Sequence, residues 1–268
     1  MAIGVSVIIP MYNAGNTIIG CLDSILDQTY TDFEIIIVDD GSTDSSYEIV
    51  KDYINKNNIQ NLTLLKQDNQ GPSIARNKGW DIATQPYIAF LDADDTWHPE
   101  KIAIQLKYMI EHSDVVITGH GVRWLRSVDI NITSLPTNYT VKPISRFQML
   151  LSNCLATRSV MLKREIDFRF EPTKRFSEDY LLWLSIILSG NKAAFIDLEL
   201  AYTYKAPYGE GGLSGDLWNM EKGELDVFNR LRKSNKISML EWLILNLYSL
   251  LKFLLRWIKC NIRFNTVM

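Results

Sequence analysis

The chain has 268 residues, of which 47% are hydrophobic and 22% charged, and it carries a net charge of −3. This composition is typical of a soluble globular protein and excludes disordered, collagen-like and disulfide-scaffold classes. Residues 230–268 contain eight basic residues and one acid, a net charge of +7 that leaves −10 on the rest. An acidic body argues against nucleic acid as a partner, and a basic, Leu- and Trp-rich tail favours an anionic membrane surface.

The first 118 residues alternate short hydrophobic runs with stretches of helical periodicity. The expected strands, rich in β-branched and aromatic residues, are Val5–Pro10, Phe33–Val38, Leu62–Lys66, Tyr87–Leu91 and Val115–Thr118. The expected helices between them are Thr17–Leu26, Ser46–Asn55, Ser73–Ala83 and Pro99–Glu111. Near-continuous hydrophobicity is typical of strands buried on both faces, and strand–helix repetition implies right-handed crossovers. The sequence therefore predicts an α/β fold with a mainly parallel, Rossmann-like sheet flanked by helices.

The regular alternation ends after Gly119. Residues 120–145 show little periodicity and predict a loop region. Glu178–Leu188 has the pattern of a helix, and Ala193–Leu200 that of a further strand. The glycine-rich segment Tyr208–Gly215 has two open interpretations: a lid that closes over the substrates, or a connector to C-terminal helices.

The C-terminal segment Met239–Cys260 is strongly apolar but is interrupted by charged residues. On a helix, four basic side chains at three- and four-residue spacing share one face: Lys252, Arg256, Lys259 and Arg263. Apolar side chains cover much of the other face: Leu247, Leu250, Leu251, Leu254, Leu255 and Ile258. This pattern predicts amphipathic helical structure lying in the membrane interface, with contact through residues 239–263. The alternative is a helix packed on the body of the protein or on a second subunit.

The three cysteines are far apart, and none belongs to a CxxC pair or another metal-binding spacing. They therefore predict neither a disulfide framework nor a zinc site, which is typical of a reducing cytoplasm. The N-terminal apolar run Ile3–Ile9 is too short for a signal peptide and has no basic start, so we interpret it as a strand. Together these features predict a cytoplasmic protein.

Acidic residues follow two of the expected strands. Asp39 and Asp40 end the second, and Asp92, Asp94 and Asp95 follow the fourth. In parallel α/β sheets ligands bind at the carboxyl ends of the strands, where clustered carboxylates repel one another unless a cation lies between them. Oxygen ligands suit Mg²⁺ or Mn²⁺, which also bind substrate phosphates. The sequence thus predicts a metal–diphosphate site. The alternative for Asp39 and Asp40 is that they stabilise a turn, and the alternative for one of the acids after the fourth strand is that it caps the next helix.

Five motifs, in a fixed order, resemble those of family 2 glycosyltransferases of the GT-A fold, which are inverting enzymes that use nucleotide sugars. They are Val7–Asn13, Val38–Asp44, Asn69–Asn77, Asp92–Asp95 with Pro99–Lys101, and Glu178–Asp179. The similarity extends from about Val5 to Gly190. It implies a GT-A domain at 1–225, with a nucleotide-sugar half at about 1–120 and an acceptor half at about 121–225. Residues 226–268 then form a basic amphipathic helical tail.

The resemblance implies nucleotide-binding roles for five residues. Pro10 and Tyr12 would form a wall against the base. Asp39 would accept the hydrogen bond of the ring N–H, Arg76 would be the cation near the nucleotide, and Asp92 would reach the ribose or a metal-bound water.

The resemblance also implies a metal ligand, a sugar-binding residue and a catalytic pair. Asp94 would bind Mn²⁺ or Mg²⁺, and Asp95 would orient the sugar. Asp179 would be the general base for the acceptor hydroxyl, with its neighbour Glu178 raising its pKa. The alternative for this pair is two acids favoured by the dipole in the first turn of a helix. Asp40 is expected to support a turn.

The function implied is metal-dependent transfer of a hexose from a nucleotide sugar to a glycan hydroxyl. UDP is favoured, with GDP and dTDP left open. The acceptor implied is linked to a polyprenyl diphosphate, in synthesis of a surface polysaccharide such as O-antigen or capsule, by analogy rather than residue chemistry. The protein would then lie on the inner face of the cell membrane as a peripheral protein.

Two other classes fit single motifs. Asp92–Thr96 spells the DxDxT of haloacid-dehalogenase-type phosphatases, with Asp92 as nucleophile, but that motif follows the first strand of its fold and here it follows the fourth. A receiver-like signalling module also has acids at strand ends. Receivers are about half this length, place the acid pair after strand one, and leave Glu178–Asp179 unexplained.

Overall fold

The structure is a computed structural model that describes residues 3–125, 134–204 and 215–266, with the side chains of the last helix described to Ile258. The strands are β1 (Val5–Met11), β2 (Phe33–Asp40), β3 (Leu62–Gln67), β4 (Tyr87–Phe90), β5 (Asp95–Trp97), β6 (Val115–Trp124), β7 (Val141–Pro143), β8 (Met161–Lys163) and β9 (Lys192–Thr203). The helices are α1 (Ile18–Leu26), α2 (Ser46–Asn57), α3 (Pro72–Ile82), α4 (Lys101–Glu111), α5 (Arg146–Leu151), the 3-10 turn η1 (Thr157–Ser159), α6 (Glu178–Ile187), α7 (Leu217–Lys233) and α8 (Met239–Thr266).

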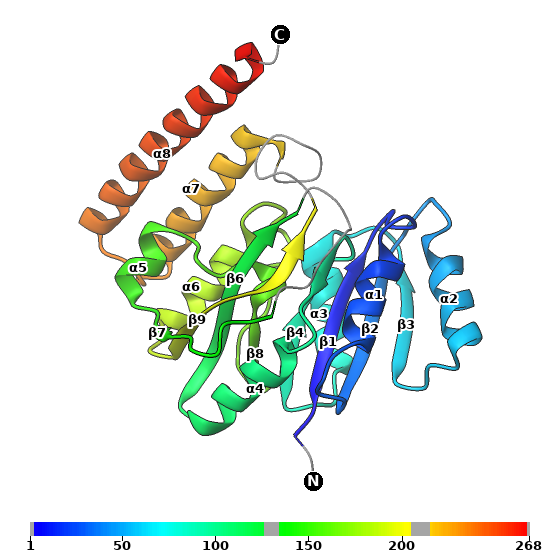
Figure 1. The fold of residues 1–268 in the computed structure, drawn as a ribbon. Helices are drawn as coiled ribbons and strands as arrows, with labels where there is room; N and C mark the ends of the chain where they lie inside the picture. The colour runs from blue at the N-terminus through cyan, green and yellow to red at the C-terminus, as the bar shows by residue number, and fades with distance from the viewer. Residues whose placement is uncertain (1–2, 126–133, 205–214, 267–268) are drawn as a thin grey trace.

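The first half of the sheet has the predicted parallel arrangement. Strands β3, β2, β1 and β4 lie side by side in that order and run parallel, with α1, α2 and α3 as the crossovers (Figure 1). The strand order reverses between β1 and β4. In open α/β sheets ligands bind outside the carboxyl ends of the strands at such a switch point. The acids that follow β2 and β4 therefore lie at the edge where a ligand is expected.

The second half of the sheet is mixed. Strand β8 runs antiparallel to both β4 and β6, and β6 runs parallel to β9. Strands β5 and β7 pair with β9 in antiparallel fashion. The α/β class with flanking helices is confirmed, and the antiparallel strands extend the predicted parallel sheet.

The prediction of a loop over residues 120–145 is partly wrong, because β6 continues to Trp124 and β7 lies within this range. The two glycines of β6, Gly119 and Gly121, have a packing role. A Cβ at Gly119 would lie 2.4 Å from the Leu155 side chain, and one at Gly121 would lie 3.0 Å from the Leu198 carbonyl. Close approach of neighbouring chain segments therefore explains glycine within this strand.

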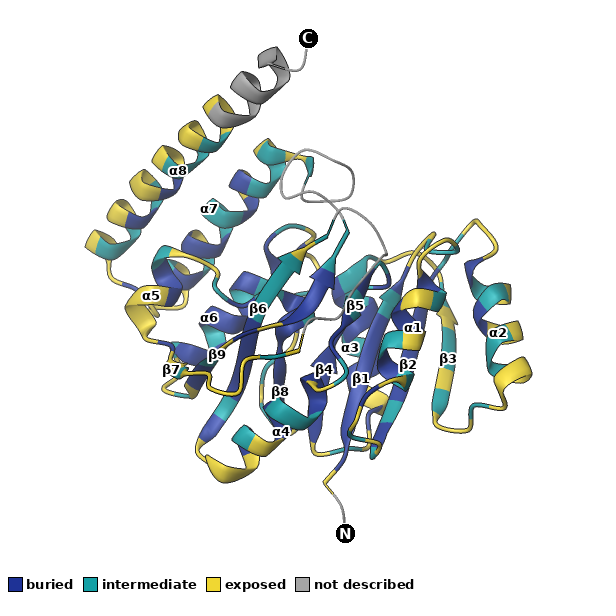
Figure 2. Cartoon of the chain, viewed as in Figure 1, coloured by how far each residue is buried: buried dark blue, intermediate teal, exposed yellow. Residues whose placement is uncertain are grey.

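Hydrophobic cores cover both faces of the sheet, as the near-continuous apolar runs predict. Along β1, Ile8 packs in the core that includes α3 and α6, whereas Val7 and Ile9 pack in the core that includes α1 and α4. The central strands are buried along most of their length (Figure 2). This two-sided packing fixes the strand ends, and with them the positions of the acids.

Helices α7 and α8 pack against each other at the side of the molecule away from β3 (Figure 1). Helix α7 runs through residue 225, so the expected boundary between GT-A domain and tail falls within a helix. Of the segment Tyr208–Gly215, all but the last residue lies outside the described residues. None of the described helices combines the length and apolar character that crossing a bilayer requires.

Candidate active site

The expected base-binding residues lie at the carboxyl ends of β1 and β2. Met11 pairs with Asp39 in the sheet, so Tyr12, the residue after Met11, lies at the same edge, two positions after Pro10. Asp39 is fully buried, and its Oδ1 accepts a hydrogen bond from the Ser42 N–H (3.2 Å). Its Oδ2 is buried without a hydrogen-bond partner. Since leaving a buried acceptor unpaired is costly, this oxygen suits the ring N–H of a base.

Asp40 has the structural role expected of it. Its Oδ1 accepts hydrogen bonds from the Gln70 N–H and the Gln67 Nε2 (both 2.8 Å), and its Oδ2 accepts one from the Gly71 N–H (2.8 Å). The carboxylate thereby ties the end of β2 to the loop that leads into α3. Gly71 has φ +90°, a backbone conformation that favours glycine, immediately before Pro72 starts the helix.

We expect Asp40→Ala to destabilise the fold, because it leaves two backbone N–H groups of the β3–α3 loop without their acceptor. The expected loss is about 3 kcal/mol of unfolding free energy, measured by urea denaturation. Asp52→Ala on the exposed face of α2 is the matched control and should change stability by less than about 0.5 kcal/mol. Equal stability of the two variants would contradict the role given to Asp40.

Arg76 joins the acids that follow β4 to those that begin α6. It is buried on α3, with Nη2 2.8 Å from Asp92 Oδ1 and Nη1 2.9 Å from Glu178 Oε1. Although burial lowers the pKa of Arg76, the two carboxylates raise it above its usual value, so the guanidinium stays charged. A planar guanidinium with several donors can hold two carboxylates at once. The predicted cation is therefore placed between the two acid groups.

We expect Arg76→Met to lower the free energy of unfolding by about 3–5 kcal/mol, because it leaves two acids without their shared cation. Arg76→Lys should recover only part of the loss, since one ammonium cannot reproduce the bridging geometry. Lys51→Met is the matched control, because its ion pair with Glu48 is exposed. Thermal unfolding of the three variants tests this, and a wild-type melting temperature for Arg76→Met would contradict it.

The acids after β4 differ in exposure. Asp92 and Asp94 are partly exposed, whereas Asp95 is buried in β5 and forms an ion pair with Arg158 (Nη1 to Oδ2, 2.6 Å). Burial raises the pKa of Asp95 to about 7, with Asp92 and Asp94 adding to the rise and Arg158 opposing it. Arg158 belongs to η1 and to no motif, so sequence reasoning missed it. Its position shows that this acid cluster contains a cation from a distant segment.

The predicted catalytic pair begins α6. Glu178 is buried toward Arg76, and burial raises its pKa against the opposing effect of that arginine. Asp179 is partly exposed, and its Oδ2 accepts hydrogen bonds from Asn153 Nδ2 (3.2 Å) and Thr157 Oγ1 (3.1 Å). The dipole alternative explains acids in a first turn, but it does not explain why both are held by side chains from other segments.

Two connections therefore bring the acids that follow β4 and the acids that begin α6 into one site. Arg76 connects Asp92 with Glu178, and η1 connects Asp95 with Asp179 through two successive residues. The predicted site residues at the ends of β2 and β4 lie at the same edge of the sheet. The positions at strand ends pointed to the acids after β2 and β4, whereas Glu178 and Asp179 were predicted from the family resemblance.

The carboxylates after β4 are oxygen donors of the kind that Mg²⁺ and Mn²⁺ prefer. Among the described residues, no three His, Cys, Asp or Glu side chains are grouped closely enough to hold an ion by themselves. Asp92 is already bound by Arg76, and Asp95 by Arg158. This donor set suits an ion that also takes ligands from substrate phosphates, and it does not fit a cage made of protein ligands alone.

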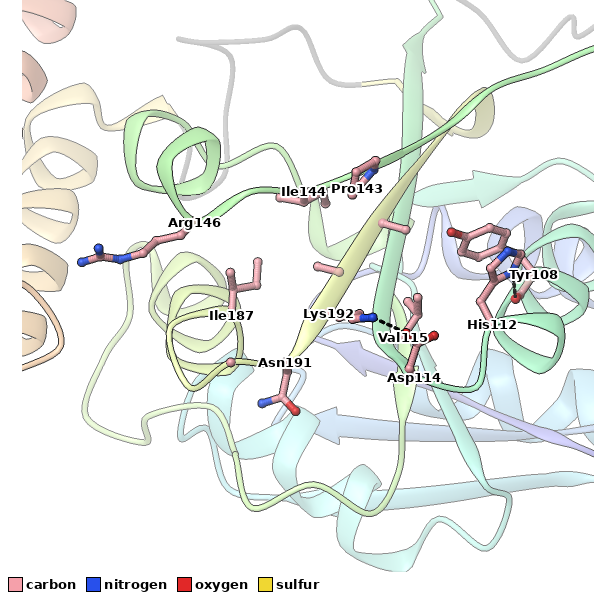
Figure 3. Close-up of a pocket in the computed structure, with 13 residues that line it drawn as sticks. Tyr108, His112, Asp114, Val115, Pro143, Ile144, Arg146, Ile187, Asn191 and Lys192 are labelled. Carbon is pink, nitrogen blue, oxygen red and sulfur yellow. Dashed lines mark hydrogen bonds and ion pairs between the residues drawn. The ribbon is translucent and has the colours of Figure 1, made fainter.

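A hollow of about 380 Å³, drawn in Figure 3, has none of these acids in its lining. Its lining includes Asp114 and Val115 before and at the start of β6, and Lys192 at the start of β9, where Lys192 forms an ion pair with Asp114. These are the starts of parallel strands, opposite to the ends that carry the acids. None of the predicted site residues lines it, so it is not the candidate active site.

Comparison with known proteins identifies the family. The sequence profile described as glycosyl transferase family 2 matches residues 6–166. The chain belongs to glycosyltransferase family 2. This glycosyltransferase is 33% identical to the putative teichuronic acid biosynthesis glycosyltransferase TuaG of Bacillus subtilis, over 85% of this chain and 88% of TuaG. Membership of the family excludes the phosphatase and receiver alternatives.

Two further relatives come from Escherichia coli. The glycosyltransferase is 35% identical, over 74% of its length and 76% of the relative, to WfaP, named a UDP-Glc:alpha-D-GlcNAc-diphosphoundecaprenol beta-1,3-glucosyltransferase. It is 42% identical to YibD, an uncharacterized glycosyltransferase, over 50% of this chain. The chain covers only 38% of YibD and about a third of two related Rickettsia proteins.

Solved structures share the fold. The glycosyltransferase matches residues 1–349 of S. aureus TarS in complex with UDP-GlcNAc with a TM-score of 0.67 at 22% identity, over 85% of this chain and 66% of that TarS fragment. It matches the mannosyltransferase PcManGT of Pyrobaculum calidifontis, in complex with GDP-Man and Mn²⁺, with a TM-score of 0.65 at 19% identity, over 85% of this chain and 64% of that one. The GT-A fold expected from the sequence is confirmed.

Proposed function

We propose that this glycosyltransferase transfers a hexose, with inversion, from a UDP-sugar to a hydroxyl of a polyprenyl-diphosphate-linked glycan during surface polysaccharide synthesis. The observation that carries the proposal is the linkage of Asp92 and Asp95 to Glu178 and Asp179 in one site. The name of WfaP, which specifies UDP-Glc and a diphosphoundecaprenol acceptor, supports the substrate classes. The TarS complex with UDP-GlcNAc supports a UDP-sugar donor.

We assign the residues the roles that the family resemblance implies. Asp39 accepts the ring N–H of the base, beside the wall formed by Pro10 and Tyr12, and Asp92 reaches toward the ribose. Asp179 takes the proton of the acceptor hydroxyl. At the same time the hydroxyl oxygen bonds to the anomeric carbon from behind, and the bond between that carbon and the diphosphate oxygen breaks.

The donor side also includes a divalent ion and a sugar-binding acid. Asp95, fixed by Arg158, orients the sugar. Asp94 would hold Mn²⁺ or Mg²⁺, which neutralises charge developing on the departing diphosphate. PcManGT in complex with Mn²⁺ supports an ion of this kind.

A panel of nucleotide sugars tests the donor and the metal together. UDP-glucose, UDP-galactose, UDP-GlcNAc and GDP-mannose are each offered with undecaprenyl-diphosphate-GlcNAc, and release of the nucleotide is measured. We expect one UDP-sugar to be used, with activity lost in EDTA and restored by Mn²⁺ or Mg²⁺. Preference for GDP-mannose, or full activity in EDTA, would contradict the donor or metal assignment.

The outer face of α8 supports a location at the membrane. All twelve exposed residues between Met239 and Ile258 are hydrophobic: Met239, Leu240, Leu243, Ile244, Leu247, Tyr248, Leu250, Leu251, Leu254, Leu255, Trp257 and Ile258. An exposed apolar face of this length marks an interaction surface. We infer that α8 lies on the inner face of the membrane with these side chains among the lipid tails.

Two basic residues of α8 have a different role from the one expected. Lys252 pairs with Glu224 of α7 (2.7 Å), and Arg256 pairs with Glu221 (3.0 Å), which is fully buried. The side chains of Lys259 and Arg263 lie outside the described residues. Lys252 and Arg256, the two described residues of the predicted basic face, thus bind α7. The expectation that they meet anionic lipid is therefore wrong for these two residues. The apolar face carries the proposed contact.

A further inference from the structure

The 3-10 turn η1 binds one acid that follows β4 and one acid at the start of α6, although it belongs to no motif. It comes directly before β8, which runs antiparallel to β4. The start of β8 therefore lies beside the end of β4, where Asp92, Asp94 and Asp95 follow in the chain. This topology brings a segment from the second half of the chain between the donor-side and acceptor-side acids.

Adjacent residues of η1 bind two different acids. Thr157 Oγ1 donates a hydrogen bond to Asp179 Oδ2 (3.1 Å), and Arg158 Nη1 donates to Asp95 Oδ2 (2.6 Å). A 3-10 helix has three residues per turn, so successive side chains diverge by roughly 120°. A single turn of this type can direct neighbouring side chains to two sides of a site.

The turn is itself held in place by hydrogen bonds. The Arg158 carbonyl accepts one from Trp97 Nε1 (2.8 Å), and the Ser159 carbonyl accepts one from Gln105 Nε2 (2.9 Å). Ser159 Oγ donates to the Ala156 carbonyl (2.7 Å). Because its backbone is anchored to β5 and α4, the turn can fix the side chains that it presents.

Asp179 is held by three donors. Its Oδ2 accepts from Thr157 and from Asn153 Nδ2 (3.2 Å), and its Oδ1 accepts from the Tyr180 N–H (2.7 Å). An ionised carboxylate has about four lone-pair sites, so these contacts fix its orientation and leave room for one more donor. An acceptor hydroxyl is a donor of the required kind.

We propose that Thr157 is a positioning residue that fixes Asp179, so that the carboxylate faces the acceptor hydroxyl while Arg158, the next residue, fixes the donor-side Asp95. This inference rests on the proposed function and adds residues that no motif assigns. Because Thr157 acts through Asp179, its loss should slow transfer without weakening binding of the donor.

The test compares Thr157→Val, which keeps the shape and removes the hydroxyl, with Thr157→Ser, which keeps the hydroxyl. Each is assayed with the UDP-sugar and undecaprenyl-diphosphate-GlcNAc that wild-type enzyme uses. We expect Thr157→Val to lower kcat about 10-fold with the KM for UDP-sugar and the Kd for UDP within about twofold, and Thr157→Ser to stay within about twofold of wild type. Thr140→Val is the matched control, since its hydroxyl lies 3.4 Å from surface Asp197.

A double-mutant cycle separates positioning from a merely structural role. In an Asp179→Asn background, Thr157→Val should lower kcat by less than about twofold further, because its partner no longer acts as a base. A full 10-fold loss in that background, or wild-type kcat for Thr157→Val alone, overturns the inference. If Thr157→Val does not fold, Asn153→Leu removes the other donor to the same oxygen from an exposed position and should lower kcat in the same way. Wild-type enzyme that transfers no sugar overturns the proposed function, and this inference with it.

Discussion

Asp179→Asn is expected to lower kcat by about 10²–10⁴-fold, the usual contribution of a general base, while the KM for the UDP-sugar changes less than about threefold. Asparagine keeps the shape of the side chain and can still accept a hydrogen bond from Thr157, but it cannot take up the proton of the acceptor hydroxyl. In the proposed function the donor is bound by residues at the ends of β1, β2 and β4, which the substitution leaves in place. Steady-state transfer with a lipid-linked acceptor measures both constants.

Glu178→Gln provides the contrast for this prediction. Glu178 is buried against Arg76, so removing its charge leaves the guanidinium with one carboxylate partner, Asp92. We expect a lower melting temperature for Glu178→Gln and an unchanged one for Asp179→Asn, whose side chain is partly exposed. The assignment of the base is wrong if Asp179→Asn retains more than about a tenth of wild-type kcat. It is also wrong if Glu178→Gln loses more activity than Asp179→Asn loses.

Residues with a local signal were predicted from the sequence. Asp39, Asp92 and Asp94 each follow a strand that is continuous in its hydrophobicity, and the structure places them at one edge of the sheet. The parallel half of the sheet was predicted for the same reason. The predicted strand Val115–Thr118 is shorter than β6 because the regular alternation ends after Gly119, and the close approach that requires Gly119 and Gly121 is made by residues far away in the chain.

Residues whose role depends on long-range contacts were not predicted. Arg158 lies 63 residues from Asp95, and Thr157 lies 22 residues from Asp179, in a turn without a motif. Only the antiparallel pairing of β8 with β4 brings this turn to the site. Periodicity also predicted the two faces of α8 but not which face packs inward. The acids of α7, Glu221 and Glu224, decide this by binding its basic residues.

The charge arrangement of the described side chains of α8, from Met239 to Ile258, predicts that the proposed membrane contact is hydrophobic rather than electrostatic. Wild-type protein is expected to bind vesicles of phosphatidylcholine alone, and about equally well at low and high salt, because the outward face of α8 from Met239 to Ile258 carries no charged residue. Co-sedimentation with vesicles measures the bound fraction. Binding only to vesicles that contain phosphatidylglycerol, and its loss in high salt, would show instead that basic residues reach the lipid.

Replacing Leu247, Leu251 and Leu254 together with serine should detach the protein from these vesicles. The three side chains are exposed on the outer face of α8, and burial of a leucine contributes roughly 1.5–3 kcal/mol, so the partition coefficient should fall by about 10³-fold or more. The matched control is Ile82→Ser with Ile110→Ser, two exposed isoleucines on α3 and α4. If the triple variant sediments with vesicles like wild type, α8 is not the contact. If it instead converts a dimer to a monomer in vesicle-free solution, the outer face binds a second copy of the chain, because the same apolar area would then be buried between protomers.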